Sequence, residues 1–107
     1  DALPEDHPQK DLLETYKKNY EAKFDGNVST FGGHAYDAFI ILEEAVKKAN
    51  SIETEAVRNA IENIKGLPGT GGIFSFSAED HNGLGIDSFE MLTVKDGDFA
   101  LLEMEKE

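Results

Sequence analysis

Apolar residues in the first part of the chain recur every three or four positions, which is the spacing of amphipathic helices. The first predicted helix covers roughly residues 8–24, and its apolar positions are Leu12, Leu13, Tyr16, Tyr20 and Phe24. A capping box over Asp6–Gln9 is expected at its start, with Pro8 tolerated in the first turn. Asp25–Asn27 is a turn signal that ends it.

The second predicted helix begins at Ser29 or Thr30, because either side chain can cap a helix. One of its faces carries apolar and small residues, namely Phe31, Ala35, Ala38, Leu42, Ala45 and Ala49. Phe39, Ile41 and Val46 widen this apolar surface. A stripe of that width predicts a helix that is covered on two sides.

A third, shorter helix follows the break at Asn50–Glu55, and its apolar positions are Val57, Ala60, Ile61 and Ile64. Gly66 and Pro68 are expected to end it. The glycine-rich Gly69–Gly72 is interpreted as a flexible joint or turn, and the alternation in Ile73–Ser77 predicts a strand.

A β-hairpin is predicted at roughly residues 88–104, because Asp96-Gly97 is a strong two-residue turn signal between two apolar segments. The three helices have broad apolar faces, but the few predicted strands do not form a sheet on which these faces can pack. An isolated hairpin is only marginally stable in water. The pattern is therefore typical of the closing part of a larger α/β protein.

The composition and net charge of the chain exclude several classes of binding partner and site. The chain has 107 residues, which suffices for one small domain, and a net charge of -12. Such a charge disfavours nucleic acid and anionic membrane surfaces as partners. Cysteine is absent from the sequence, which excludes disulfides, thiolate catalysis and cysteine metal sites. No apolar run approaches the roughly 18 residues of a membrane span.

Candidate catalytic chemistry is sparse. His34 and Asp37 are three residues apart and can share a helix face, as a metal pair or a base and its orienting carboxylate would. A third ligand or a nucleophile at matched spacing is absent, which favours a helix-cap histidine. The loop from Asp80 resembles a calcium loop only faintly, since Met91 stands where an EF-hand has glutamate. We therefore expect no enzyme activity, no metal and no cofactor.

The entrance of the second helix, STFGGHAYDAF, leaves two interpretations open. A helix N-terminus suits a carboxylate or another anion, glycines allow close approach, and Phe31 can form an apolar wall. This interpretation predicts a small-molecule site. In the other, Phe31 is a hydrophobic staple and Gly32-Gly33 accommodate packing. Spacing alone favours packing.

Several segments together resemble a known family. They are Tyr36-Asp37-Ala38, EAVRNAI, GGIFSF, DHNGLG and VKDGDF, in this order and at this spacing. Over Leu12–Leu102 the chain is similar to the C-terminal part of the periplasmic solute-binding proteins of branched-chain amino acid ABC transporters. These are the Leu/Ile/Val-binding group of type I periplasmic binding proteins.

The resemblance implies an α/β fold, of which this chain would be a C-terminal fragment with three helices, a short strand and a β-hairpin. The whole receptor would have two lobes that close on a ligand and deliver it to an ABC transporter permease, in the periplasm or outside the cell. Residues 1–70 would be a helical segment packing on a lobe whose sheet lies elsewhere. Residues 71–107 would cross back through the hinge. Without the remainder of the receptor, we expect self-association or domain swapping.

The resemblance also implies one ligand contact. With the chains aligned on Tyr36, Phe31 falls where relatives have an aromatic residue that packs on the ligand. The expected ligand is a branched-chain amino acid or a related small amino-acid or amide solute. No role is assigned to Gly32, Gly33 or His34, where the chain departs from the alanine-rich helix start of the family. The alternative function is an acidic helical protein-interaction module with no small-molecule ligand.

Overall fold

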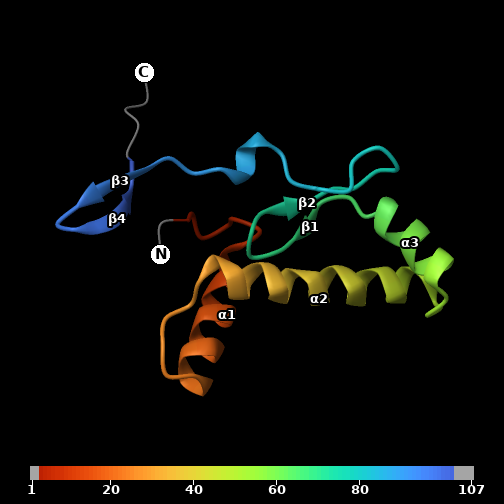
Figure 1. Ribbon diagram of the computed structural model, residues 1–107, viewed down its shortest axis with the longest axis horizontal. Coiled ribbons are helices and arrows are strands. Elements are labelled where there is room, and N and C mark those ends of the chain that lie inside the picture. Colours follow the sequence, from red (N-terminus) through yellow and green to blue (C-terminus); the bar gives the residue numbers. More distant parts are fainter. Residues whose placement is uncertain (1–2, 103–107) are drawn as a thin grey trace.

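The longest element, helix α2 (Thr30–Ala49), forms the axis of the molecule in a computed structural model that describes residues 3–102. Helix α1 (Lys10–Lys23) crosses it near its N-terminal end, and α3 (Thr54–Glu62) lies at its C-terminal end (Figure 1). The predicted order of three helices followed by short strands is confirmed.

Helix α1 lies in the predicted segment but begins differently. Its N-cap is Gln9, which makes no side-chain capping bond, so the predicted capping box is wrong. The side-chain amide of Gln9 instead donates a hydrogen bond, through Nε2, to the backbone carbonyl of Gly69, at 2.9 Å. A tertiary contact has therefore replaced a local one. Phe24 ends the helix in an extended conformation.

Helix α2 begins as predicted. The Ser29 hydroxyl accepts a hydrogen bond from the Gly32 amide at 3.4 Å and caps the helix. The helix ends at Asn50, which adopts the left-handed conformation with a φ of 48°. Asparagine tolerates this conformation better than most residues do.

The buried side of α2 differs from the predicted one. The stripe that is buried or partly buried passes through Gly33, Asp37, Ile41 and Ala45, at steps of four residues. Most of the predicted apolar face is exposed, including Phe31, Ala35, Ala38 and Leu42. The reason is that the Gly69–Gly72 turn needs small residues and a carboxylate on the helix, rather than apolar side chains. Among residues 3–102, the predicted apolar face is therefore not covered, and the neighbours contact α2 along the buried stripe and, through Tyr16 of α1, at Gly32.

The hydrophobic core lies where α2, α3 and the strands meet. Its buried residues are Ala45, Ile64, Phe74 and Phe76. Partly buried side chains surround them, namely Ile41, Val57, Ala60, Ile61, Leu67 and Leu84. Helix α3 ends at Glu62, so Ile64 reaches the core from beyond the helix rather than from its last turn.

Two short strands, β1 (Leu67–Pro68) and β2 (Ile73–Phe74), pair antiparallel beside α2. The predicted strand at 73–77 is confirmed only in its first two residues. The chain then bonds elsewhere, because the Phe76 amide donates to the Ile64 carbonyl at 2.9 Å. Strand β1 was not expected, since Pro68 is typical of a segment that ends a helix.

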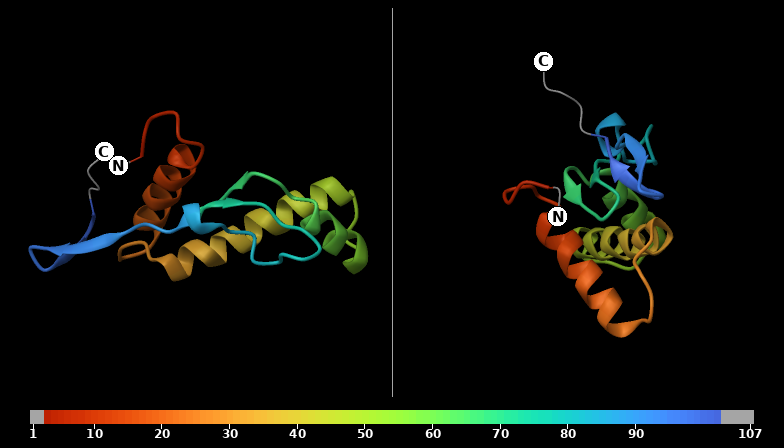
Figure 2. Two further views of the ribbon diagram at one scale, coloured as in Figure 1. Left: turned by 90° about the horizontal axis from the view of Figure 1, so that it is seen from above. Right: turned by 90° about the vertical axis from the view of Figure 1, so that its left-hand side faces the viewer.

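The predicted hairpin is confirmed as β3 (Leu92–Lys95) and β4 (Asp98–Leu101), which follow the short 3-10 helix η1 (Ile86–Ser88). Asp96 and Gly97 have φ values of 54° and 83°, as the predicted tight turn requires. Every strand residue except the partly buried Ala100 is exposed, and the hairpin extends away from the helices (Figure 2). The last predicted residues, 103 and 104, lie outside the described part. Among the described residues, no helix is long and apolar enough to cross a membrane.

Candidate functional site

Phe31 lies in the first turn of α2 and is 89% exposed. A hydrophobic staple joins the residue before the cap to the fourth helical residue. With Ser29 as the cap, Phe31 is the second helical residue, so the staple interpretation is wrong. Its ring is free to contact a ligand or another part of a larger protein.

A cavity of about 350 Å³ lies beside this helix start, between α1, α2 and the turn that joins β1 to β2. Its walls include Leu13, Tyr16, Lys17, Ser29, His34 and Thr70. Both apolar and polar groups are therefore available on its surface. Phe31 does not line this cavity.

The two glycines at the helix start are explained by close packing. A Cβ atom at Gly32 would lie 2.9 Å from the Tyr16 hydroxyl of α1. A Cβ at Gly33 would lie 2.7 Å from the Thr70 hydroxyl. Both separations are shorter than ordinary contacts, so the glycines let α1 and the turn approach α2 from two sides. The sequence predicted such packing without identifying the neighbours.

Asp37 is 2% exposed, and its carboxylate binds the same turn. Oδ1 accepts a hydrogen bond from the Thr70 amide at 2.5 Å, and Oδ2 accepts one from the Gly71 amide at 2.8 Å. Bonds from two amides offset the cost of burying the carboxylate. Since both oxygens hold the backbone, Asp37 is not placed to orient His34 as a base.

The Gly69–Gly72 segment is a fixed turn rather than a flexible joint. The Gly69 amide donates to the Gly72 carbonyl at 2.8 Å, which closes the turn. Gln9 binds the carbonyl of Gly69 from the start of α1, and Asp37 holds the two middle amides. Three separate segments thus meet here. The sequence pattern paired Asp37 with His34 and placed Gln9 in a capping box, because their actual partners in the turn are distant in the chain.

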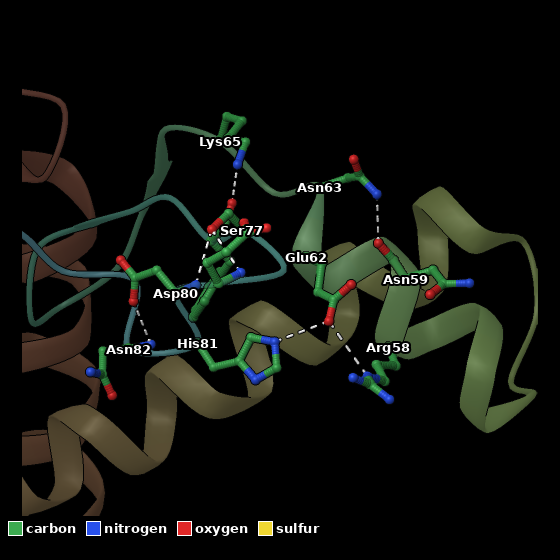
Figure 3. A network of polar contacts seen from close by, with 11 residues as sticks. Arg58, Asn59, Glu62, Asn63, Lys65, Ser77, Asp80, His81 and Asn82 are labelled. Atoms are coloured by element: carbon green, nitrogen blue, oxygen red, sulfur yellow. Dashed lines mark hydrogen bonds and ion pairs between the residues drawn. The ribbon is translucent and has the colours of Figure 1, made fainter.

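A second polar cluster lies at the opposite end of α2 (Figure 3). Glu62 of α3 contacts His81 Nε2 at 3.0 Å and Arg58 Nε at 3.5 Å. Asp80 Oδ1 accepts hydrogen bonds from the amides of Asn82 and Gly83, at 2.9 and 3.2 Å. The His81–Glu62 contact ties the loop after β2 to α3, and the Asp80 bonds hold the loop's own turn. The cluster is therefore structural, and among residues 3–102 no group of three or more acidic or histidine side chains is placed to hold a metal.

An apolar groove of about 730 Å³ lies beside this second cluster. It is lined mainly by Leu42, Val46, Ile52, Val57 and Ile61. Leu42, which lines the groove, is also one of the exposed apolar residues of α2. A surface of this kind in a soluble protein indicates contact with another part of the chain or with a second molecule.

Comparison with known proteins agrees with the resemblance at the level of the family. A family model described as periplasmic binding protein matches residues 3–98. The chain is similar to a solved structure from Rhodopseudomonas palustris strain CGA009, with 30% identity and a TM-score of 0.83. It is also similar to an extracellular ligand-binding receptor from Rhodopseudomonas palustris HaA2, with 27% identity and a TM-score of 0.76. A search of curated proteins gave no match.

A further similar structure is a type 1 periplasmic binding protein from Bordetella pertussis Tohama I, with 32% identity and a TM-score of 0.70. The alignments cover 95% of this chain for the two Rhodopseudomonas structures and 96% for the Bordetella structure. They cover only 31%, 31% and 30% of those proteins. The chain therefore spans about a third of the length of these relatives.

Proposed function

Because the chain belongs to the periplasmic binding protein family, we propose that it is part of a receptor that binds a small molecule by cleft closure, without catalysis. Its helices and short antiparallel strands match part of the type I fold, as predicted. The family and its extracellular receptor relatives indicate a periplasmic or extracellular location. In closure of this kind, contacts made only in the closed state shift the equilibrium toward it.

The ligand that we propose is a branched-chain amino acid or a related small amino-acid or amide solute. The observation that carries this proposal is Phe31, whose ring is 89% exposed at the start of α2. An apolar residue with no partner in its own segment is well suited to pack on an aliphatic ligand side chain. The resemblance to Leu/Ile/Val-binding receptors implies a ligand-contacting aromatic residue at this position, which supports the proposal. Delivery to an ABC transporter permease is part of the same proposal.

The exposed surfaces of the chain support the proposal that its two parts, residues 1–70 and residues 71–107, contact different regions of the receptor. Residues 1–70 would pack on the rest of one lobe through the outward face of α2, which includes Phe39 and Leu42. Residues 71–107 would cross the hinge and dock the hairpin elsewhere, since its strands are exposed on both faces. The division falls in the turn between β1 and β2. Separated from the remainder, these apolar surfaces would drive self-association.

Isothermal titration calorimetry on the full-length receptor tests the ligand and the role of Phe31. L-leucine, L-isoleucine and L-valine are titrated first into the wild-type protein and then into Phe31→Ala and Phe31→Tyr. We expect Phe31→Ala to weaken binding by about 1–3 kcal/mol, since the apolar contact is lost. Phe31→Tyr keeps the ring and should bind much more like the wild type.

Unchanged affinity in Phe31→Ala, with only a lower melting temperature, would assign Phe31 to packing between lobes instead. If neither these amino acids nor their amides bind the wild-type protein, the proposed ligand class is wrong. Capture of a protein partner in that case would favour the acidic interaction module.

A further inference from the structure

We propose that Asp37 is a positioning residue for the ligand site, because it fixes the turn on which both the start of α2 and the segment leading to the hairpin rest. This inference rests on the proposed receptor function. The Asp37 clamp is defined as the Asp37 carboxylate with the amides of Thr70 and Gly71, at 2.5 and 2.8 Å.

The first contact of the clamped turn is with the ligand-side end of α2. Thr70 packs so closely on Gly33 that an added Cβ there would lie 2.7 Å from its hydroxyl. Thr70 and Gly71 also line the cavity of about 350 Å³ beside the helix start. A shift of the turn therefore moves a wall that lies within one helical turn of Phe31.

The second contact is with the segment that precedes the hairpin. A Cβ at Gly72 would lie 2.6 Å from the Ser88 hydroxyl and 2.9 Å from Leu84 Cδ2. Ser88 is the last residue of η1, and three residues separate it from the start of β3 at Leu92. The turn thus lies between α2 on one side and the root of the hairpin on the other. A single buried carboxylate sets the position of both.

The chemistry of the clamp requires a carboxylate, because two amides each need an acceptor oxygen. An aspartate accepts a hydrogen bond on each oxygen, whereas asparagine accepts on one atom and presents an N–H group on the other. In Asp37→Asn that group would face either the Thr70 or the Gly71 amide, leaving a partly buried donor without its acceptor. Gly69 lets the turn come this close, because a Cβ there would lie 2.9 Å from Asp37 Oδ1.

The test compares Asp37→Asn with Asp25→Asn, an exposed aspartate in the loop between α1 and α2, in the full-length receptor. Amide hydrogen exchange is followed by NMR at Thr70, Gly71 and Ser88, and L-leucine binding by calorimetry. We expect Asp37→Asn to speed exchange at all three amides and to weaken leucine binding at least about tenfold. Asp25→Asn should change neither.

Fast exchange at Thr70 and Gly71 in the wild-type protein would overturn the proposal, and this measurement does not depend on the variant folding. Unchanged leucine affinity in Asp37→Asn, alongside weakened binding in Phe31→Ala, would also overturn it while the proposed function stands. If leucine fails to bind the wild type, the proposed ligand is wrong. The exchange rate of the Ser88 amide in Asp37→Asn then tests whether the clamp positions the segment that precedes the hairpin. An unchanged rate at Ser88 would overturn that part of the proposal.

Discussion

The rings of Phe74 and Phe76 stack in the core, with centroids 5.8 Å apart and an interplanar angle of 6°. Residues two apart in an extended segment point to the same face, which places both rings against α2 and α3. The Phe76 amide donates a hydrogen bond to the carbonyl of Ile64, so the segment after β2 is held to the chain just beyond α3. This pair joins the strands to the helices.

Truncation of Phe76 should therefore be costly. We expect Phe76→Ala to lower the free energy of unfolding by about 3–5 kcal/mol, because it leaves a cavity and loses the stacked ring. Phe76→Leu keeps most of the apolar volume and should cost less than about 1.5 kcal/mol. Urea denaturation of the full-length receptor measures both. Equal small losses in the two variants would show that this core is loosely packed.

Replacement by alanine should destabilise the protein much more at Gly69 than at Gly32. A Cβ at Gly69 would lie 2.6 Å from the Phe74 ring and 2.9 Å from Asp37 Oδ1, and neither neighbour can move away cheaply. We expect Gly69→Ala to destabilise the protein by about 1–3 kcal/mol.

In Gly32→Ala, the one close neighbour within residues 3–102 is the terminal hydroxyl of Tyr16, which can shift slightly. Alanine is also the better helix former by about 0.5–1 kcal/mol. The loss in Gly32→Ala should accordingly be much smaller than in Gly69→Ala, or absent. Thermal unfolding of the two variants provides the comparison, and a larger loss in Gly32→Ala would contradict the packing described here.

Lys10 should contribute a pH-dependent stability. Its ammonium group lies 3.2 Å from Glu5 and 3.5 Å from Glu14. The hydrogen bond and the charge of Glu5 raise the pKa of Lys10 above its ordinary value, with Glu14 adding to the effect. A raised pKa means that the stabilisation is complete below about pH 10.4, the unfolded value, and is lost as the pH rises through the folded pKa.

The stability difference between wild type and Lys10→Gln is therefore expected to stay constant near neutral pH and to shrink at high pH. Urea midpoints measured from about pH 8 to above pH 11 follow it. Lys18→Gln is the control, because Lys18 has no ion pair among residues 3–102. A difference that grows with pH would show that Lys10 is not stabilised by its acidic neighbours.

Sequence patterns were most reliable where the interactions are local. Ser29 capping and the Asp96-Gly97 turn depend on neighbouring residues, and both are as predicted. The buried side of α2 was not predicted correctly. The hydrophobicity pattern predicts burial of Phe31 and Leu42, but the residues that pack on the turn are Gly33 and Asp37. A carboxylate 33 residues from its amide partner leaves no periodic signal.

At the candidate site the same distinction holds. The sequence identified the helix entrance and its glycines, but not that Tyr16 and Thr70 occupy the space they leave. The role of Phe31 came from a family resemblance, and its exposure at the helix start is compatible with that role. Nothing in the spacing of apolar residues separates a ring that binds a ligand from one that packs on another lobe.

The exposed hairpin has a consequence for the order of folding. Its two strands are joined by a two-residue turn, so they can pair within microseconds without help from distant residues. A two-stranded ribbon with both faces in water is nevertheless marginal, and such a ribbon opens about as readily as it closes. We expect β3 and β4 to form early and repeatedly during folding of the receptor. They would become permanent only in the last step, when another part of the protein covers them.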